Sequence, residues 1–329
     1  MNKLFELSFL KQLKGMGNAT INKTYIAPLV QGQGIDELIE IIKEKSPRIT
    51  KENIDSAKAA AYDQYNSFLA DNGISVVTIF DDDYPAGLHD LQDKKPLILY
   101  VKGNKTALCH DAVAVIGTRK PSKWSECAEK GLVQTLTEIS DYTIISGLAL
   151  GCDKIAHQTA LDYHAETVAV LPSGINVITP AQHKKLASDI ITSGGCLVSE
   201  YLPDSKATRN TYIERDFVIA ALTKATIVIE CGVKSGTMHT VDAAQQMNRK
   251  LACYYPNDIS KGDYEGNTFM HQEKGAVKLY GTAELNKFLK NMKIKPTIPE
   301  SEQLSFFTDV NNNTVNVIAN NTQRFIASI

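Results

Sequence analysis

The strongest constraint on the fold is an alternation of short apolar runs with amphipathic stretches that starts near residue 111. The apolar runs are continuous and rich in β-branched residues, as in strands buried on both faces, and they are Ala112–Ile116, Thr143–Ile145, Thr167–Leu171, Cys196–Val198, Thr226–Ile229 and Leu251–Tyr255. Helical stretches separate them, at 122–139, 153–163, 180–192, 211–223 and 237–248. With right-handed crossovers, this order predicts a Rossmann-like, doubly wound α/β fold with a mainly parallel sheet.

The segments around this core suggest two further parts of the chain. Residues 1–72 have helical periodicity and predict a small N-terminal helical domain. Its turn at 15–18, Gly-Met-Gly-Asn, resembles a helix-hairpin-helix, whose backbone amides can bind a DNA phosphate; a plain helix turn is the alternative. The α/β domain is expected over 73–292, entered through two edge strands at 74–79 and 96–103 and closed by a helix near 282–291. The polar, Asn-rich segment 293–329 predicts a flexible tail.

Composition argues against several classes of protein. No apolar run approaches the ~18 residues that span a membrane, and the first residues lack the apolar core of a signal peptide, so we expect a cytoplasmic, non-membrane protein. The six cysteines are scattered, without a C-x-x-C pair or a Cys/His cluster. This pattern favours single thiols over zinc or a disulfide framework. The net charge of −2 means that any DNA binding needs a local concentration of cations.

The loop after the first predicted strand has the chemistry of a phosphate site. It begins Gly117-Thr118-Arg119-Lys120 and reaches a helix start at Ser122. Glycine lets the backbone approach a ligand closely, a helix N-terminus favours anions, and two cations stand beside it. The alternative is an ordinary turn with surface charges.

A second loop has the same character. Lys234 is followed by Ser235, Gly236 and Thr237 at a predicted helix start, which brings together two hydroxyls, a glycine and free amides. Both loops follow strands, and in a doubly wound sheet ligands bind beyond the carboxyl ends of the strands. We therefore expect them to contribute to one anion site.

A third loop runs from Ser146 and Gly147 into a helix that carries Asp153 and His157. It lacks the G-x-G-x-x-G pattern and the following acidic residue of a dinucleotide site, so a nicotinamide cofactor is not expected. We predict no cofactor for this chain. Asp153 is either a helix cap or functional, and His157 is either packed in the helix or functional. Gly174 lies in a similar small-residue loop after the third strand.

Together these segments resemble the DNA-processing protein A (DprA/Smf) family. Matching segments occur in the family's order between about 84 and 280, and they are Tyr84-Pro85, 96–103, 115–119, 146–153 with Ala156-His157 and Ala160-Leu161, 168–175, 199–201, 235–237, Gly266-Asn267 and Gly275-Ala276. The resemblance implies a Rossmann-like core, single-stranded DNA in a basic pocket, a homodimer, and handover of DNA to a RecA-type recombinase, with no catalytic residues. The candidate DNA- or phosphate-binding residues are Gly117, Thr118, Arg119, Lys120, Ser146, Gly147, Gly174, Arg215, Lys234, Ser235, Gly236 and Thr237.

The chain departs from the family at one motif. Where the family commonly has Arg-Asn-Arg, this sequence has Arg215-Asp216-Phe217. One cation is lost and one acid appears, so the resemblance alone does not fix the affinity for DNA.

A short motif in the tail points to a second partner. Gln303, Leu304, Phe306 and Phe307 resemble the peptide with which bacterial proteins bind the DNA-polymerase sliding clamp. The alternative is a hydrophobic tail that packs on its own domain or on a dimer mate.

Two other functions stay open at this point. One is a nucleotide sensor or nucleotide-base hydrolase of the related lysine-decarboxylase-like LOG superfamily. Its glycine-rich loop is followed by a glutamate, where this chain has Thr240, although Glu200 or Glu230 could substitute. The other is an adaptor that brings a recombinase or the clamp to DNA.

Overall fold

The computed structural model describes residues 3–69 and 73–292. Its centre is a sheet of nine strands in the order β1-β2-β6-β5-β4-β3-β7-β8-β9. The first two strands pair antiparallel at one edge, β2 also runs antiparallel to β6, and all remaining neighbours are parallel. The strands are β1 Ser75–Thr78, β2 Ile98–Gly103, β3 Ala112–Ile116, β4 Thr143–Ser146, β5 Thr167–Val170, β6 Cys196–Ser199, β7 Ala225–Val228, β8 Lys250–Tyr254 and β9 Val277–Leu279. The predicted Rossmann-like, mainly parallel α/β fold is confirmed.

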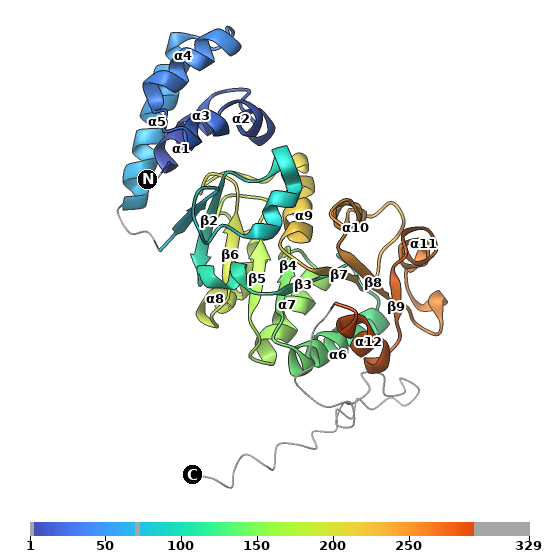
Figure 1. The fold of residues 1–329 in the computed structure, drawn as a ribbon. Helices are drawn as coiled ribbons and strands as arrows, with labels where there is room; N and C mark the ends of the chain where they lie inside the picture. Colours follow the sequence, from blue (N-terminus) through green and yellow to red (C-terminus); the bar gives the residue numbers. More distant parts are fainter. Residues whose placement is uncertain (1–2, 70–72, 293–329) are drawn as a thin grey trace, which may run out of the picture.

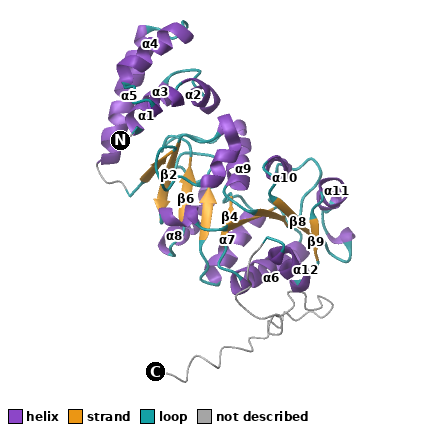
Figure 2. Ribbon diagram, viewed as in Figure 1, coloured by secondary structure: helices purple, strands orange, loops and turns teal. Residues whose placement is uncertain are grey.

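Helices cover both faces of this sheet (Figure 2). They are α6 Lys123–Ile139, α7 Cys152–Asp162, α8 Lys184–Thr192, α9 Arg209–Ala221, α10 Thr237–Gln246, α11 Glu265–Lys274 and α12 Thr282–Lys290. Five of the helices that the sequence predicted are present, but the one expected at 180–192 is split into a 3-10 turn at Ala181–His183 and α8. Helix α11 and strand β9 were not predicted from the sequence.

Central strand β3 shows why the apolar runs are continuous. Ala114 and Ile116 pack with the helices α9 and α10, whereas Val113 and Val115 pack with α6, α7 and α12. Successive side chains of a strand point to opposite faces. A strand with helices on both sides must therefore be apolar at every position.

The order of the strands creates one crevice. From β3 the chain proceeds outward through β4, β5 and β6, then returns to add β7 on the other side of β3. The loops that leave the carboxyl ends of β3 and β7 consequently diverge to opposite faces. Such a switch point is where open α/β sheets bind ligands.

The N-terminal helices lie at the β1–β2 end of the sheet (Figure 1). They are α1 Leu4–Gln12, α2 Asn18–Thr24, α3 Ile26–Val30, α4 Ile35–Lys45 and α5 Lys51–Leu69. The turn between α1 and α2 contacts the sheet domain, because Asn18 Nδ2 donates to Glu200 Oε2 at 2.7 Å and Lys11 Nζ donates to the Glu200 carbonyl at 3.1 Å.

Several predicted features are neither confirmed nor contradicted by the structure. The domain limits at 72 and 292 and a DNA contact at the α1–α2 turn stay predictions. The flexible tail and its clamp-binding motif, Gln303 to Phe307, lie outside the described residues. Within the described ranges, each helix is too short or too polar to cross a membrane.

Candidate functional site

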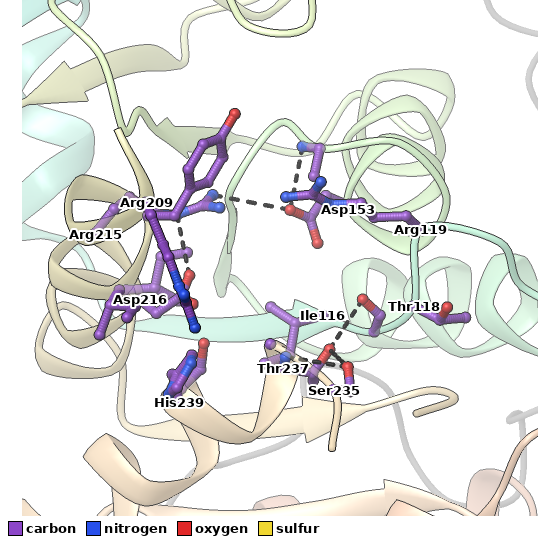
Figure 3. Close-up of a pocket in the computed structure, with 17 residues that line it drawn as sticks. Ile116, Thr118, Arg119, Asp153, Arg209, Arg215, Asp216, Ser235, Thr237 and His239 are labelled. Atoms are coloured by element: carbon purple, nitrogen blue, oxygen red, sulfur yellow. Dashed lines mark hydrogen bonds and ion pairs between the residues drawn. The ribbon is translucent and has the colours of Figure 1, made fainter. Parts of the chain in front are cut away.

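A cavity of about 530 Å³ opens at the switch point between β3 and β7 (Figure 3). Its walls come from the β3 loop, the start of α7, helix α9 and the start of α10. The lining residues are Ile116, Gly117, Thr118, Arg119, Ala149, Asp153, Arg209, Tyr212, Ile213, Arg215, Asp216, Ile219, Ser235, Gly236, Thr237, His239 and Thr240.

Hydrogen bonds between the two predicted anion loops form one side of the cavity. Thr237 Oγ1 donates to the Gly117 carbonyl at 3.2 Å, and Ser235 Oγ donates to Thr237 Oγ1 at 3.0 Å. Both hydroxyl protons are thus used within the protein. The N-terminal end of α10, with Gly236 exposed at its start, supplies the positive end of a helix dipole to the cavity.

Arg119 is an available cation of the site. Its side chain is exposed, its guanidinium lies 5.4 Å from the centre of the Tyr212 ring, and it makes no ion pair with any described residue. A ring face orients a guanidinium without neutralising its charge. Arg119 can therefore give a phosphate paired, charge-assisted hydrogen bonds.

Arg215 has a different position. It is 5% exposed, its Nη1 lies 3.3 Å from the Val170 carbonyl and 3.9 Å from Asp153 Oδ2, and its Nε lies 3.1 Å from Asp216 Oδ1. The contact with Asp216 is an ion pair rather than an aligned hydrogen bond. The charge of Arg215 is thus largely balanced inside the protein, and this residue mainly holds α9 against the sheet.

Asp216 makes the electrostatics of the cavity depend on pH. Burial raises the pKa of this carboxyl to about 6; the neighbouring Asp153 acts in the same direction, while Arg215, His239 and Arg119 oppose the rise. Above that pKa, three guanidinium groups face two carboxylates in the lining, and the excess is one positive charge. Below it, protonation removes one of the two negative charges.

The predicted site residues divide into those at the cavity and those behind it. Seven line it, namely Gly117, Thr118, Arg119, Arg215, Ser235, Gly236 and Thr237. Lys120 and Lys234 are exposed beside these residues but outside the lining.

The other three predicted residues are buried. Ser146 Oγ donates to the Val115 carbonyl at 2.8 Å, and Gly174 lies against the backbone carbonyls of Leu202 and Pro203. Because Gly147 has no side chain, the Arg215 guanidinium can occupy the space beside its Cα. These residues support the fold around the cavity instead of facing it.

Sequence reasoning missed several lining residues. Arg209, Tyr212 and Asp216 come from the first turns of α9, and His239 comes from the first turn of α10. The spacing of 209, 212 and 216 places them on one side of a helix, but the sequence does not say which side faces the crevice. Asp153, for which a helix cap and a functional role were both open, accepts from the Ala149 amide at 3.2 Å, faces Arg215 and lines the cavity.

His157 is packed in the core, which was one of its two predicted roles. Its Nδ1 lies 2.7 Å from Thr167 Oγ1, and the side chain is fully buried. Burial, with smaller contributions from His183 and Arg215, lowers its pKa to about 3. The imidazole is consequently neutral, and it does not line the cavity.

Comparison with known proteins identifies the family. Residues 75–290, more than half of the chain, match the family model described as DNA recombination-mediator protein A. The chain belongs to this family. The matched range contains the whole cavity and excludes the N-terminal helices.

Individual relatives agree with this assignment. The chain is 31% identical to Protein Smf of Escherichia coli over 65% of its own length and 56% of that protein, and 32% identical to DNA processing protein DprA of Streptococcus pneumoniae over 64% and 73%. It thus spans just over half of the Escherichia coli protein. Both lie in the DprA/Smf family that the sequence motifs resembled.

Two solved structures share the fold. DNA processing protein A of Streptococcus pneumoniae has a TM-score of 0.72 at 27% identity, covering 86% of this chain and 96% of the other. The Helicobacter pylori protein, whose structure concerns its single-stranded DNA binding mode, has a TM-score of 0.59 at 27% identity over 66% and 96%.

The carboxylates considered for a base hydrolase lie elsewhere. Glu200 accepts from Asn18, and Glu230 Oε2 accepts from the backbone and hydroxyl of Ser122 at 2.9 and 2.8 Å. Neither lines the cavity, where Thr240 stands in place of the glutamate of that superfamily.

Proposed function

We propose that this recombination-mediator family member binds single-stranded DNA by seating a backbone phosphate in the cavity at the switch point. The observation that carries the proposal is the exposed guanidinium of Arg119, which forms no ion pair with a described residue and lines the cavity together with the N-terminus of α10. A phosphate between them would meet a full cation and a helix dipole together. The DNA-binding mode described for the Helicobacter pylori relative supports the same ligand class.

The wider role follows from the family. We infer that the protein acts in the cytoplasm as a homodimer and passes bound DNA to a RecA-type recombinase, as a recombination mediator would. It acts by binding and positioning DNA, and no covalent step is required. A pull-down of the recombinase from a sample without DNA tests whether the two proteins contact each other directly or are only bound to the same DNA.

Substitution of Arg119 by alanine tests the site. We expect roughly 10- to 100-fold weaker binding of labelled single-stranded DNA, because a hydrogen-bonded charge contributes about 1.5–3 kcal/mol. Fluorescence anisotropy at two salt concentrations measures the affinity. The slope of log affinity against log salt concentration should become shallower by about the amount expected for one phosphate contact.

The matched control is Arg48→Ala. Arg48 is also exposed and makes no ion pair with the described residues, and its loss changes the net charge equally. Equal weakening by both variants would show a general charge effect and contradict a phosphate at Arg119. Absence of DNA binding by the wild-type protein at low salt would reject the proposal and redirect attention to free nucleotides.

A further inference from the structure

A second cavity, of about 510 Å³, lies between the α1–α2 turn and helix α9. Figure 1 shows α9 running between the N-terminal helices and α10. The residues that line this cavity are Lys11, Met16, Gly17, Asn18, Ala19, Leu91, Lys94, Glu200, Tyr201, Ile213, Glu214, Phe217 and Val218.

Helix α9 is the wall between the two cavities. Tyr212, Asp216 and Ile219 line the first, spaced as one face of a helix, while Glu214, Phe217 and Val218 line the second. Ile213 lines both. The two spaces are therefore adjacent, separated by a single helix.

The polar groups of the second cavity do not suit an anion. Glu200 and Glu214 both line it, with Tyr201 donating to Glu214 Oε2 at 2.7 Å and Asn18 donating to Glu200 Oε2 at 2.7 Å. The ammonium of Lys11 lies near these carboxylates and donates to the Glu200 carbonyl at 3.1 Å. A phosphate here would face two acids, whereas a neutral group would not be repelled.

The apolar groups of the second cavity suit a flat ring. Phe217 and Leu91 both line the cavity and are partly buried against the main core, and Lys94 Nζ lies 5.8 Å from the centre of the Phe217 ring. Aromatic side chains are the usual platforms for unpaired bases, because every base has a π-face. Lys94 is exposed at the rim, where it can meet the sugar-phosphate backbone.

We propose that an unpaired nucleobase of the bound strand stacks on Phe217 in this second cavity. The inference rests on the proposed function, since the same strand has its phosphate beside Arg119 on the other side of α9. The strand is held by phosphate on one side of α9 and by base on the other.

Two oligonucleotides of equal length distinguish the two sites, one carrying thymine bases and one abasic. Phe217→Leu is expected to bind the base-bearing strand roughly tenfold more weakly than wild type and the abasic strand equally well. Phe217→Tyr keeps an aromatic ring and should bind the base-bearing strand as tightly as wild type does. The fluorescence of a strand that carries 2-aminopurine should be quenched when it binds the wild-type protein and much less when it binds Phe217→Leu.

The control is Phe269→Leu. Phe269 is also partly buried against the main core, and Lys274 Nζ lies 5.8 Å from its ring centre, but it lines neither of these cavities. This variant should bind both strands like wild type. Equal affinity of wild type and Phe217→Leu for the base-bearing strand overturns the base platform, even if Arg119→Ala weakens both strands. Failure of the wild-type protein to bind either strand overturns the phosphate site and the base platform together.

Discussion

Replacing Gly147 with alanine is expected to lower the free energy of unfolding by about 2–4 kcal/mol. A Cβ at this position would overlap Nη1 of Arg215 and approach Asp153 Oδ2 to 2.8 Å. The guanidinium is buried and bound to the Val170 carbonyl, so it cannot swing into solvent without separating buried charges. Urea denaturation followed by circular dichroism measures the loss.

Gly236→Ala is the matched control for this change. Gly236 lines the cavity, whereas Gly147 lies behind it; the φ of Gly236, −58°, is ordinary for alanine, and a Cβ there meets nothing within 4 Å. We expect the free energy of unfolding of Gly236→Ala to equal that of wild type or to exceed it by about 0.5 kcal/mol, because alanine lowers the entropy of the unfolded chain. Equal stability of the two variants would mean that Arg215 has another accessible position, and would remove its assigned role in holding α9.

Asp216→Asn is expected to strengthen single-stranded DNA binding at pH 8 by roughly tenfold. A carboxylate several ångströms from a phosphate costs about 1–2 kcal/mol at an effective dielectric near ~20. The pKa of about 6 means that wild-type binding should tighten as the pH falls from 8 to 5, because the carboxyl becomes neutral. The variant should lack this part of the pH dependence. Since His239 is present in both proteins, the difference between them reports the carboxyl alone.

The same substitution should also change stability with pH. The side chain is 15% exposed, and its pKa rises from 3.8 in the unfolded chain to about 6 in the folded protein. The folded state therefore binds more protons between these values, and the contribution to stability is lost as pH rises through about 6. Asp216→Asn should be about 2–3 kcal/mol more stable than wild type at pH 8 and equal to it near pH 4.

An exposed acid provides the control for both measurements. Asp55→Asn makes the same chemical change on α5, at a side chain outside both cavities. It should alter neither the pH dependence of DNA binding nor that of unfolding. If Asp216→Asn behaves like Asp55→Asn, the carboxyl does not face the bound phosphate.

Much of the fold was predictable because its signals are local. Buried parallel strands must be apolar at every position, so β3, β4 and β7 are visible as short runs bounded by turns. The edge elements α11 and β9 were missed. Val277 is exposed in β9, and the strand has three residues, so it lacks the continuous apolar run that marks the central strands.

The candidate site was predictable only in part. The loops that begin at Gly117 and Ser235 could be recognised as anion-binding candidates from their own residues. The rule that ligands bind beyond the carboxyl ends of strands predicts that these loops lie together. Arg119 and Arg215 were equal candidates in the sequence, since both are arginines in matching motifs. Their environments differ because one lies on an exposed loop and the other projects from α9 between two aspartates.

The sequence by itself determined the α/β class, the loops that meet at the crevice and the family, because all three depend on local periodicity and on motif order. Tertiary structure decided which arginine is available, that Asp216 has a raised pKa and that Phe217 faces a second cavity. These properties depend on burial and on neighbours distant in the chain, such as Val170, Asp153 and Lys94. Only packing determines which groups lose water and which charges meet, and that sets the charge and the ligand of each cavity.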